Sequence, residues 1–409
     1  PPVAPPGGKD THMTTGLIDF LRRMVDAKAS DLFFSVGAPP TLKVDGELSP
    51  LDEAPLTAAD IGALALQAMD DRQQREFEET MEMNLALDMP GAGRCRVNIY
   101  RQRGNPAIAI RFITSRIPSL EELHLPALLQ KLASVPRGLV LVVGSAGAGK
   151  STTLASMIDY LNMHQGVHIL TVEDPIEYLH AHKKSIVDQR EVGLDTRSYA
   201  DALRNSMREA PDVLMIGEIR DQETMQAAIA YAETGHLCLA TLHANNTYQA
   251  LDRIVNFFPD TAHHQLLVDL SLNLKAVVSQ RLLHGAEGGR LPAVEILLGS
   301  PFVAELIEKG EIAGVRDAMK QSFDLGMLTF DESIYRLYAT GRINYDEALA
   351  NADSRTDLSL RIRLEGPQPP GGLHNELEFA QVQDIDQDGR GVSDPASAEE
   401  ASYLFVRGG

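Results

Sequence analysis

One stretch decides the fold: residues 139–152 read LVLVVGSAGAGKST. Its apolar part, Leu139 to Val143, predicts a buried strand, and the pattern G-x-x-x-x-G-K-[ST] follows directly. The glycines let backbone N–H groups turn inward around a polyphosphate, Lys150 can reach the β- and γ-phosphates, and the Ser151 hydroxyl can hold Mg²⁺. A helix expected from Thr152 to Met163 adds a favourable potential for anions at its N-terminus. The pattern therefore predicts a nucleoside triphosphate site made of Gly144, Ser145, Ala146, Gly147, Ala148, Gly149, Lys150, Ser151 and Thr152.

The bulk composition limits the classes of protein that fit. At 409 residues the chain is long enough for more than one domain. Its formal charge of −20 argues against a nucleic-acid-binding surface, which needs clustered Lys and Arg. No apolar run is long enough to span a bilayer, and no signal-peptide pattern opens the chain. The 2 cysteines, Cys95 and Cys238, suggest neither a disulfide framework nor a metal cluster, so we expect a cytoplasmic protein.

The N-terminal part of the chain predicts a small α+β domain over residues 14–114. A Pro- and Gly-rich flexible extension is expected before it, at residues 1–13. Helical spacing follows Gly16, residues 30–48 alternate like a hairpin, and Thr57 and Asp60 have capping-box spacing at the start of a second helix. Strands are expected at residues 84–87, 95–100 and 107–112, and a linker at residues 115–120 around Pro118.

A second domain is predicted over residues 121–365. Helix patterns there alternate with short apolar strands at residues 139–143, 168–172, 213–216 and 237–241. This alternation favours an α/β domain with a parallel sheet buried on both faces. The remainder to about Arg361 reads as mostly helical. Residues 366–409 are rich in acids and poor in large apolar residues, so we expect an acidic, disordered tail.

Polar residues follow each of these four strands. The first strand leads into the glycine-rich loop, and the others lead into Glu173, Glu218 and His243. Ligands of open parallel sheets bind at the carboxyl ends of the strands, so we expect these side chains to meet at one edge. Phosphoryl transfer to water needs charge neutralisation and a group that orients and deprotonates the water.

Three side chains are the candidates for this chemistry. Glu218 is the first choice for the base, because it follows an apolar strand; the alternative is an ion pair with Arg220. Glu173 is the rival base, or holds Mg²⁺ through a water molecule; the alternative is an acid that caps the turn before Pro175. His243 either contacts the γ-phosphate or is simply held in place by hydrogen bonds.

Four motifs together resemble those of a known family. Residues 144–152, 171–178, 212–221 and 234–243 look like the Walker A, Asp box, atypical Walker B and His box of the secretion ATPases, the motors of type II secretion and type IV pili. Within this family the chain is similar to the PilT-type retraction ATPases, from about Thr14 to Glu365. The resemblance implies a RecA-like P-loop NTPase domain preceded by a PAS-like domain, with ATP and Mg²⁺ as cofactors and a homo-hexameric ring.

The resemblance extends to one branch of these motors. Residues 303–311 lack a C-terminal motif of the PilT group, and residues 358–364 look like the PilU-type members. The family would make such a chain an accessory motor that acts with a PilT-like motor and an inner-membrane pilus platform protein. It also implies that Arg96 and Arg111 reach the triphosphate of a neighbouring subunit, since a planar guanidinium can stabilise phosphate charge.

The four motifs and the family resemblance imply two possible functions. The first is a cytoplasmic Mg-dependent ATPase that drives pilus retraction and twitching motility, peripherally associated with the inner-membrane face of the pilus machine and without direct membrane insertion. The alternative is a ring subunit whose nucleotide site is regulatory and which acts mainly by docking to a partner motor. A nucleic-acid translocase is disfavoured by the acidic charge.

Overall fold

The computed structural model describes residues 16–51, 54–89, 93–113 and 116–366. They form two compact units. The first takes in the described residues of Pro1–Leu123, with Ala133–Val142 and Gly149–His243; the second takes in His124–Leu132, Val143–Ala148 and the described residues of Ala244–Gly409. The predicted extension at residues 1–13 lies outside the described residues, and so does the predicted tail beyond Gly366. The domain boundaries stay predictions.

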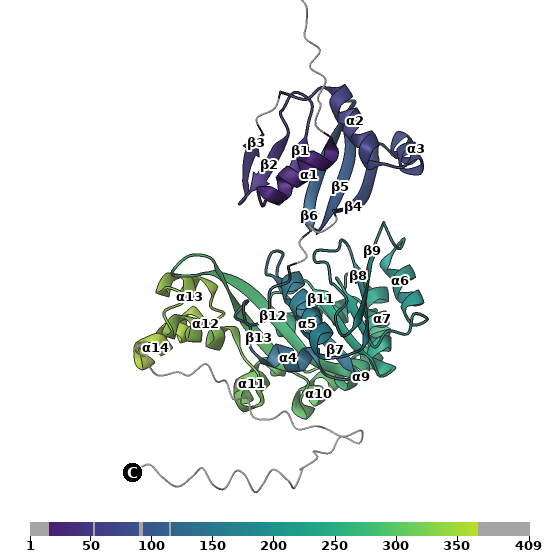
Figure 1. Ribbon diagram of the computed structural model, residues 1–409. Coiled ribbons are helices and arrows are strands. Elements are labelled where there is room, and N and C mark those ends of the chain that lie inside the picture. The colour runs from purple at the N-terminus through teal and green to yellow at the C-terminus, as the bar shows by residue number, and fades with distance from the viewer. Residues whose placement is uncertain (1–15, 52–53, 90–92, 114–115, 367–409) are drawn as a thin grey trace, which may run out of the picture. The chain divides into compact units, whose positions relative to one another are not determined.

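A six-stranded antiparallel sheet forms the N-terminal part of the first unit (Figure 1), with the order β3-β2-β1-β6-β5-β4. Its strands are β1 Asp31–Phe34, β2 Thr41–Val44, β3 Glu47–Pro50, β4 Glu82–Met89, β5 Gly93–Gln102 and β6 Asn105–Ile113. The helices beside it are α1 Leu17–Asp26, α2 Ala58–Ala68 and α3 Asp71–Thr80. Five of these strands and the first two helices confirm the elements expected from the sequence. Strand β3 was not predicted as a strand of its own, because all of its residues are exposed and no alternation marks it.

Local signals explain two of these helices. The Thr57 side chain accepts a hydrogen bond from the backbone of Asp60, whose carboxylate accepts one from the backbone of Thr57, so the predicted capping box begins α2. Helix α3 was not predicted, because Phe77 is its single buried residue and no apolar stripe reveals it. Asp70 and Gln73 form a second capping box, which is the signal that could have found it.

A seven-stranded sheet follows, with the order β13-β12-β7-β11-β10-β8-β9. Its strands are β7 Gly138–Val143, β8 His168–Glu173, β9 Ile186–Glu191, β10 Val213–Ile216, β11 Leu237–Leu242, β12 Leu274–His284 and β13 Arg290–Leu298. The four predicted strands are confirmed as β7, β8, β10 and β11, and every residue of β7, β10 and β11 is buried. Strands β9, β8, β10 and β11 pair in parallel, as expected.

The expectation of a mostly helical remainder is wrong for residues 274–298. Strands β12 and β13 pair as an antiparallel hairpin, with Ala276 opposite Leu298 and His284 opposite Arg290. An apolar run such as that of β12 cannot be told from a buried helix by periodicity alone. The overlooked signal is the glycine-rich connection, in which Gly288 and Gly289 adopt φ values of +89° and +73°.

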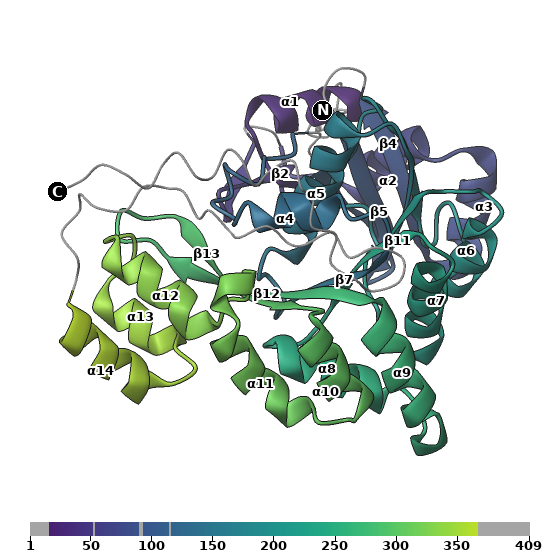
Figure 2. The ribbon, with the colours of Figure 1, turned by 90° about the horizontal axis from the view of Figure 1, so that it is seen from below.

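Helices account for most of the remaining chain. They are α4 Leu128–Ala133, α5 Lys150–His164, α6 Tyr199–Ser206, α7 Gln222–Glu233, α8 Thr247–Asn256, α9 His263–Asn273, α10 Pro301–Glu308, α11 Ile312–Gln321, α12 Phe330–Ala339, α13 Tyr345–Asn351 and α14 Arg355–Glu365, with 3-10 turns at Asp260–Ala262 and Phe323–Leu325. In the second unit, α12, α13 and α14 gather beside the β12–β13 hairpin (Figure 2). Buried residues such as Leu283, Phe330 and Ile334 join them in one core.

Candidate functional site

The glycine-rich loop between β7 and α5 has the backbone geometry that a phosphate cradle needs. Gly144, Gly147 and Gly149 have φ values of +156°, +75° and +89°. A Cβ on Gly144 would lie 2.7 Å from the carbonyl oxygen of Gln280 and 2.9 Å from the Ala148 Cβ, so this position excludes a side chain. Helix α5 begins at Lys150 with no side-chain cap on its first turn. Such a turn presents backbone N–H groups to an anion.

Lys150 and His243, two of the predicted site residues, are in contact. The Lys150 Nζ lies 3.3 Å from the His243 Nδ1, and the His243 Nε2 lies 3.0 Å from the Glu218 Oε1. A charged ammonium only donates, so Nδ1 accepts and the ring proton sits on Nε2, facing the carboxylate. Burial lowers the pKa of Lys150, and the Glu218 and Glu177 carboxylates partly offset this effect. The structure thus brings together the ends of β10, β11 and the start of α5.

Glu218 is held from two sides. Besides the histidine, the Arg220 Nε lies 2.6 Å from the Glu218 Oε2, and the Arg220 Nη1 reaches the Asp174 Oδ2 at 3.3 Å. The ion pair considered as an alternative for Glu218 is therefore present, together with the contact to His243. Only 16% of the Glu218 side chain is exposed. Its carboxylate is consequently fixed in orientation at the edge of the sheet.

Glu173 ends β8 in a different environment. Its Oε1 accepts hydrogen bonds from the Thr171 hydroxyl at 2.7 Å and the Gln189 amide at 3.1 Å. Burial raises its pKa from 4.5 to about 7, although these hydrogen bonds favour the ionised form. The neighbouring strand approaches closely, because a Cβ on Gly217 would lie 3.2 Å from the Glu173 Cα. Among the described residues, no hydrogen bond joins Glu173 directly to the series of contacts between Lys150, His243 and Glu218.

Tyr178 and Gln189 are neighbours of the site that sequence reasoning missed. The Tyr178 hydroxyl lies 3.0 Å from the Thr152 hydroxyl, and the Tyr178 carbonyl accepts a hydrogen bond from Gln189 at 2.9 Å. Gln189 therefore joins Glu173 to the segment that contacts the first turn of α5. Tyr178 ends the motif at residues 171–178, which is the signal that could have found it. Gln189 lies in β9, which carries no such pattern.

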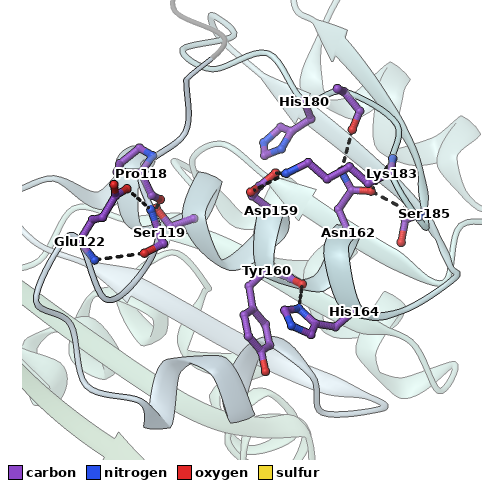
Figure 3. Close-up of polar contacts among 12 residues, drawn as sticks. Pro118, Ser119, Glu122, Asp159, Tyr160, Asn162, His164, His180, Lys183 and Ser185 are labelled. Carbon is purple, nitrogen blue, oxygen red and sulfur yellow. Dashed lines mark hydrogen bonds and ion pairs between the residues drawn. The ribbon is translucent and has the colours of Figure 1, made fainter.

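The rest of α5 is anchored to the chain segment that follows Tyr178 (Figure 3). The Lys183 Nζ contacts both Asp159 carboxylate oxygens, at 2.6 and 2.9 Å, and Asn162 donates to the Ala181 carbonyl at 2.7 Å. The His180 ring lies in this neighbourhood, and burial lowers its pKa to about 4, so the ring is neutral. These contacts fix the helix whose first turn carries Lys150 and Ser151.

A cavity of about 470 Å³ adjoins the glycine-rich loop within the second unit. Residues 145–148 form one wall, and the charged members of its lining, Arg281 and Arg290, are both cationic. Its lining includes no carboxylate among the described residues, although the chain carries 57 acidic residues against 37 basic ones. This composition suits a ligand with negative charge.

The predicted trans-acting arginines lie in the N-terminal sheet. Arg96 in β5 is paired directly opposite Arg111 in β6, so both project from the same face. The Arg111 Nε contacts the Asp31 Oδ1 at 2.8 Å, while 70% of the Arg111 side chain is exposed. One ion pair therefore holds Arg111, while most of its side chain stays exposed.

The residues present fit Mg²⁺ bound mainly by phosphates. The described residues contain no group of three or more His, Cys, Asp or Glu side chains that could hold a metal ion by themselves. Ser151 in the first turn of α5 and the carboxylates at the strand ends are hard oxygen donors, which Mg²⁺ prefers, and this ion keeps waters and phosphate oxygens as its other ligands.

The chain is similar to known proteins over most of its length. A family model described as Type II/IV secretion system protein matches residues 12–289. The type IV pilus ATPase PilU of Pseudomonas aeruginosa is 49% identical over 372 residues, covering 91% of this chain and 97% of that protein. The type IV pilus retraction ATPase PilT of the same organism is 41% identical over 324 residues, covering 79% and 94%.

Solved structures give the same result. The crystal structure of the pilus retraction motor PilT with bound ADP has a TM-score of 0.79 and 39% identity, covering 85% of this chain and 99% of that one. The Legionella pneumophila ATPase DotB has a TM-score of 0.71 and 25% identity, covering 83% and 96%. These likenesses confirm the predicted fold of a small α+β domain followed by an ATPase domain. Among the described residues, no helix is both long and apolar enough to cross a membrane.

Proposed function

Because the chain belongs to the type II/IV secretion system protein family and, within it, to the type IV pilus retraction ATPases, we propose that it hydrolyses Mg-ATP at the end of β7 and works as an accessory motor of the PilU type. The observation that carries the catalytic proposal is the contact series from Lys150 through His243 to Glu218, beside the glycine-rich loop.

Each side chain has a role in the proposed reaction. The loop N–H groups and Lys150 bind the β- and γ-phosphate oxygens. Glu218 orients a water molecule and takes its proton while the water oxygen attacks the γ-phosphorus and the bond to the β–γ bridging oxygen breaks, which yields ADP and phosphate. His243 and Arg220 hold the Glu218 carboxylate from both sides. The Ser151 hydroxyl would hold Mg²⁺, and the bound ion would neutralise phosphate charge.

Glu218 suits the base role better than Glu173. Glu218 contacts His243, which in turn contacts Lys150 of the glycine-rich loop, whereas Glu173 accepts its hydrogen bonds from Thr171 and Gln189. Glu173 then serves by holding the end of β8, or by contacting Mg²⁺ through a water molecule. The choice between the two acids is open to a direct test.

Assembly and partners are further parts of the proposal. We propose a homo-hexamer in which Arg96 and Arg111 approach the triphosphate of a neighbouring subunit. The face that the two arginines share and the exposure of the Arg111 side chain support this. A PilT-like motor and an inner-membrane pilus platform protein are the proposed partners, at the cytoplasmic face of the inner membrane. The similarity to PilU and PilT supports these partners.

The test compares three glutamine variants. Glu218→Gln should lower kcat about 10²- to 10⁴-fold and leave ATP binding intact, since the amide keeps the shape but cannot take a proton. Glu173→Gln should retain most turnover. Glu223→Gln is the matched control, because Glu223 is also paired with an arginine, Arg204, at 3.7 Å, on the outer side of α7.

Two outcomes would redirect the proposal. A large loss in Glu173→Gln with normal turnover in Glu218→Gln would move the base role to Glu173. Lys150→Ala should abolish hydrolysis; if a Lys150→Ala strain still retracts pili whenever a PilT-like motor is active, the nucleotide site is regulatory and the chain acts mainly by docking.

A further inference from the structure

We propose that Arg281 is a positioning residue that ties the segment following His243 to the C-terminal helices, and thereby holds His243 in register with Glu218. This inference rests on the proposed function for its effect on turnover. Its structural basis lies entirely in the second unit, in the contacts of one guanidinium group.

Arg281 joins segments that are distant in the sequence. Its Nη1 donates to the Asn351 carbonyl at the end of α13, at 2.8 Å, and its Nη2 lies 2.7 Å from the Asp353 Oδ1. Nη2 also donates to the Asn245 carbonyl at 3.4 Å. Asn245 stands two residues after His243, so the loop that carries the histidine is tied to the turn between α13 and α14.

The guanidinium is set on a rigid base. Its central carbon lies 3.8 Å from the centre of the Phe330 ring, which is fully buried at the start of α12. Only 24% of the Arg281 side chain is exposed. Arginine can stack its planar guanidinium on an aromatic ring while it donates hydrogen bonds in several directions, and lysine cannot. The arrangement therefore fixes three chain segments through one side chain.

The same part of β12 borders the glycine-rich loop. Gln280, the residue before Arg281, presents its carbonyl oxygen at 2.7 Å from where a Gly144 Cβ would stand. Arg281 itself lines the cavity that residues 145–148 help to enclose. A shift of this strand would therefore reach both the loop wall and the Asn245 segment. Misplacement of a reacting group by about 1 Å can cost about 100-fold in rate.

Arg361 offers a matched control in the same unit. Its guanidinium stacks at 3.9 Å over the Tyr335 ring and contacts the Glu332 and Glu365 carboxylates. It thus has the same kind of aromatic and carboxylate partners as Arg281. The hydrogen bonds of Arg361 stay within α12 and α14, and among the described residues none of them reaches the Asn245 segment. A loss of packing alone should affect both positions alike.

The experiment uses the full chain with Arg281→Met, which keeps the aliphatic stem and removes the fork. We expect kcat to fall about 10- to 100-fold with a smaller change in KM, and hydrogen exchange at residues 243–246 to accelerate. Arg361→Met should lower the thermal midpoint without either effect. Arg281→Lys should restore part of the turnover; it also serves as the folded variant if Arg281→Met unfolds.

A double variant separates positioning from general damage. In a His243→Ala background, Arg281→Met should cause no further loss of kcat. A full additional loss there, or equal losses of kcat in Arg281→Met and Arg361→Met, would overturn the inference. Hydrogen exchange decides the structural part independently: unchanged exchange at residues 243–246 in Arg281→Met refutes the tether even if the chain proves not to hydrolyse ATP, whereas accelerated exchange supports it.

Discussion

Replacing Glu173 with Gln should abolish an unusual dependence of the free energy of unfolding on pH. Burial raises the pKa of Glu173 from 4.5 to about 7 in the folded protein, so folding favours the protonated carboxyl. The sign is opposite to that of a carboxylate in a salt bridge: the free energy of unfolding falls as pH rises from about 4.5 to about 7 and is constant above that range. The full shift corresponds to about 3 kcal/mol.

The variant should not share this dependence. A glutamine never ionises, and its amide oxygen can still accept the hydrogen bonds from Thr171 and Gln189. Between pH 5 and pH 8, the difference in unfolding free energy between variant and wild type should move in favour of the variant by about 2 to 3 kcal/mol. Urea unfolding of both chains at the two pH values measures this difference.

The control is Glu223→Gln, which makes the same change at an exposed acid and reports what the substitution itself does to the free energy of unfolding. If Glu173→Gln also differs from wild type by the same amount at pH 5 and pH 8, Glu173 titrates as an exposed carboxyl does. Desolvation would then not dominate the environment of this carboxyl.

Three further outcomes are expected. Gly144→Ala should abolish nucleotide binding, because its Cβ would collide with the Gln280 carbonyl. Gly147→Ala, at φ +75° with open space around it, should affect binding less and lower the free energy of unfolding in urea by only about 1 to 2 kcal/mol. Equal losses of binding in the two variants would contradict the steric reason. Thr57→Ala should lower the stability of the N-terminal sheet region by about 1 kcal/mol through loss of the capping box, measured by hydrogen exchange, and an unchanged exchange rate in α2 would refute it. Mixing Arg111→Ala with Lys150→Ala subunits should recover ATPase activity that neither has alone, if Arg111 serves a neighbouring subunit; no recovery would place its action within one chain.

The sequence predicted those parts of the fold that rest on local patterns. Apolar runs marked β7, β8, β10 and β11, and the spacing of Thr57 and Asp60 marked the start of α2. The β12–β13 hairpin was missed, because its strands are recognised by pairing with each other rather than by their own periodicity. Helix α3 was missed for a related reason, since its surface position leaves it almost no apolar face.

What the sequence alone determined is the chemistry available at the site: a glycine-rich loop with Lys150 and Ser151, and an acid or a histidine after each of the other predicted strands. Only the tertiary structure decided which residues these side chains contact. Lys150 meets His243 across 93 residues of chain, Arg220 links Glu218 to Asp174, and Arg281 gathers three separate segments. Residue types follow from local sequence, whereas burial and hydrogen-bond partners depend on which distant strands become neighbours, and that is set by packing of the whole chain.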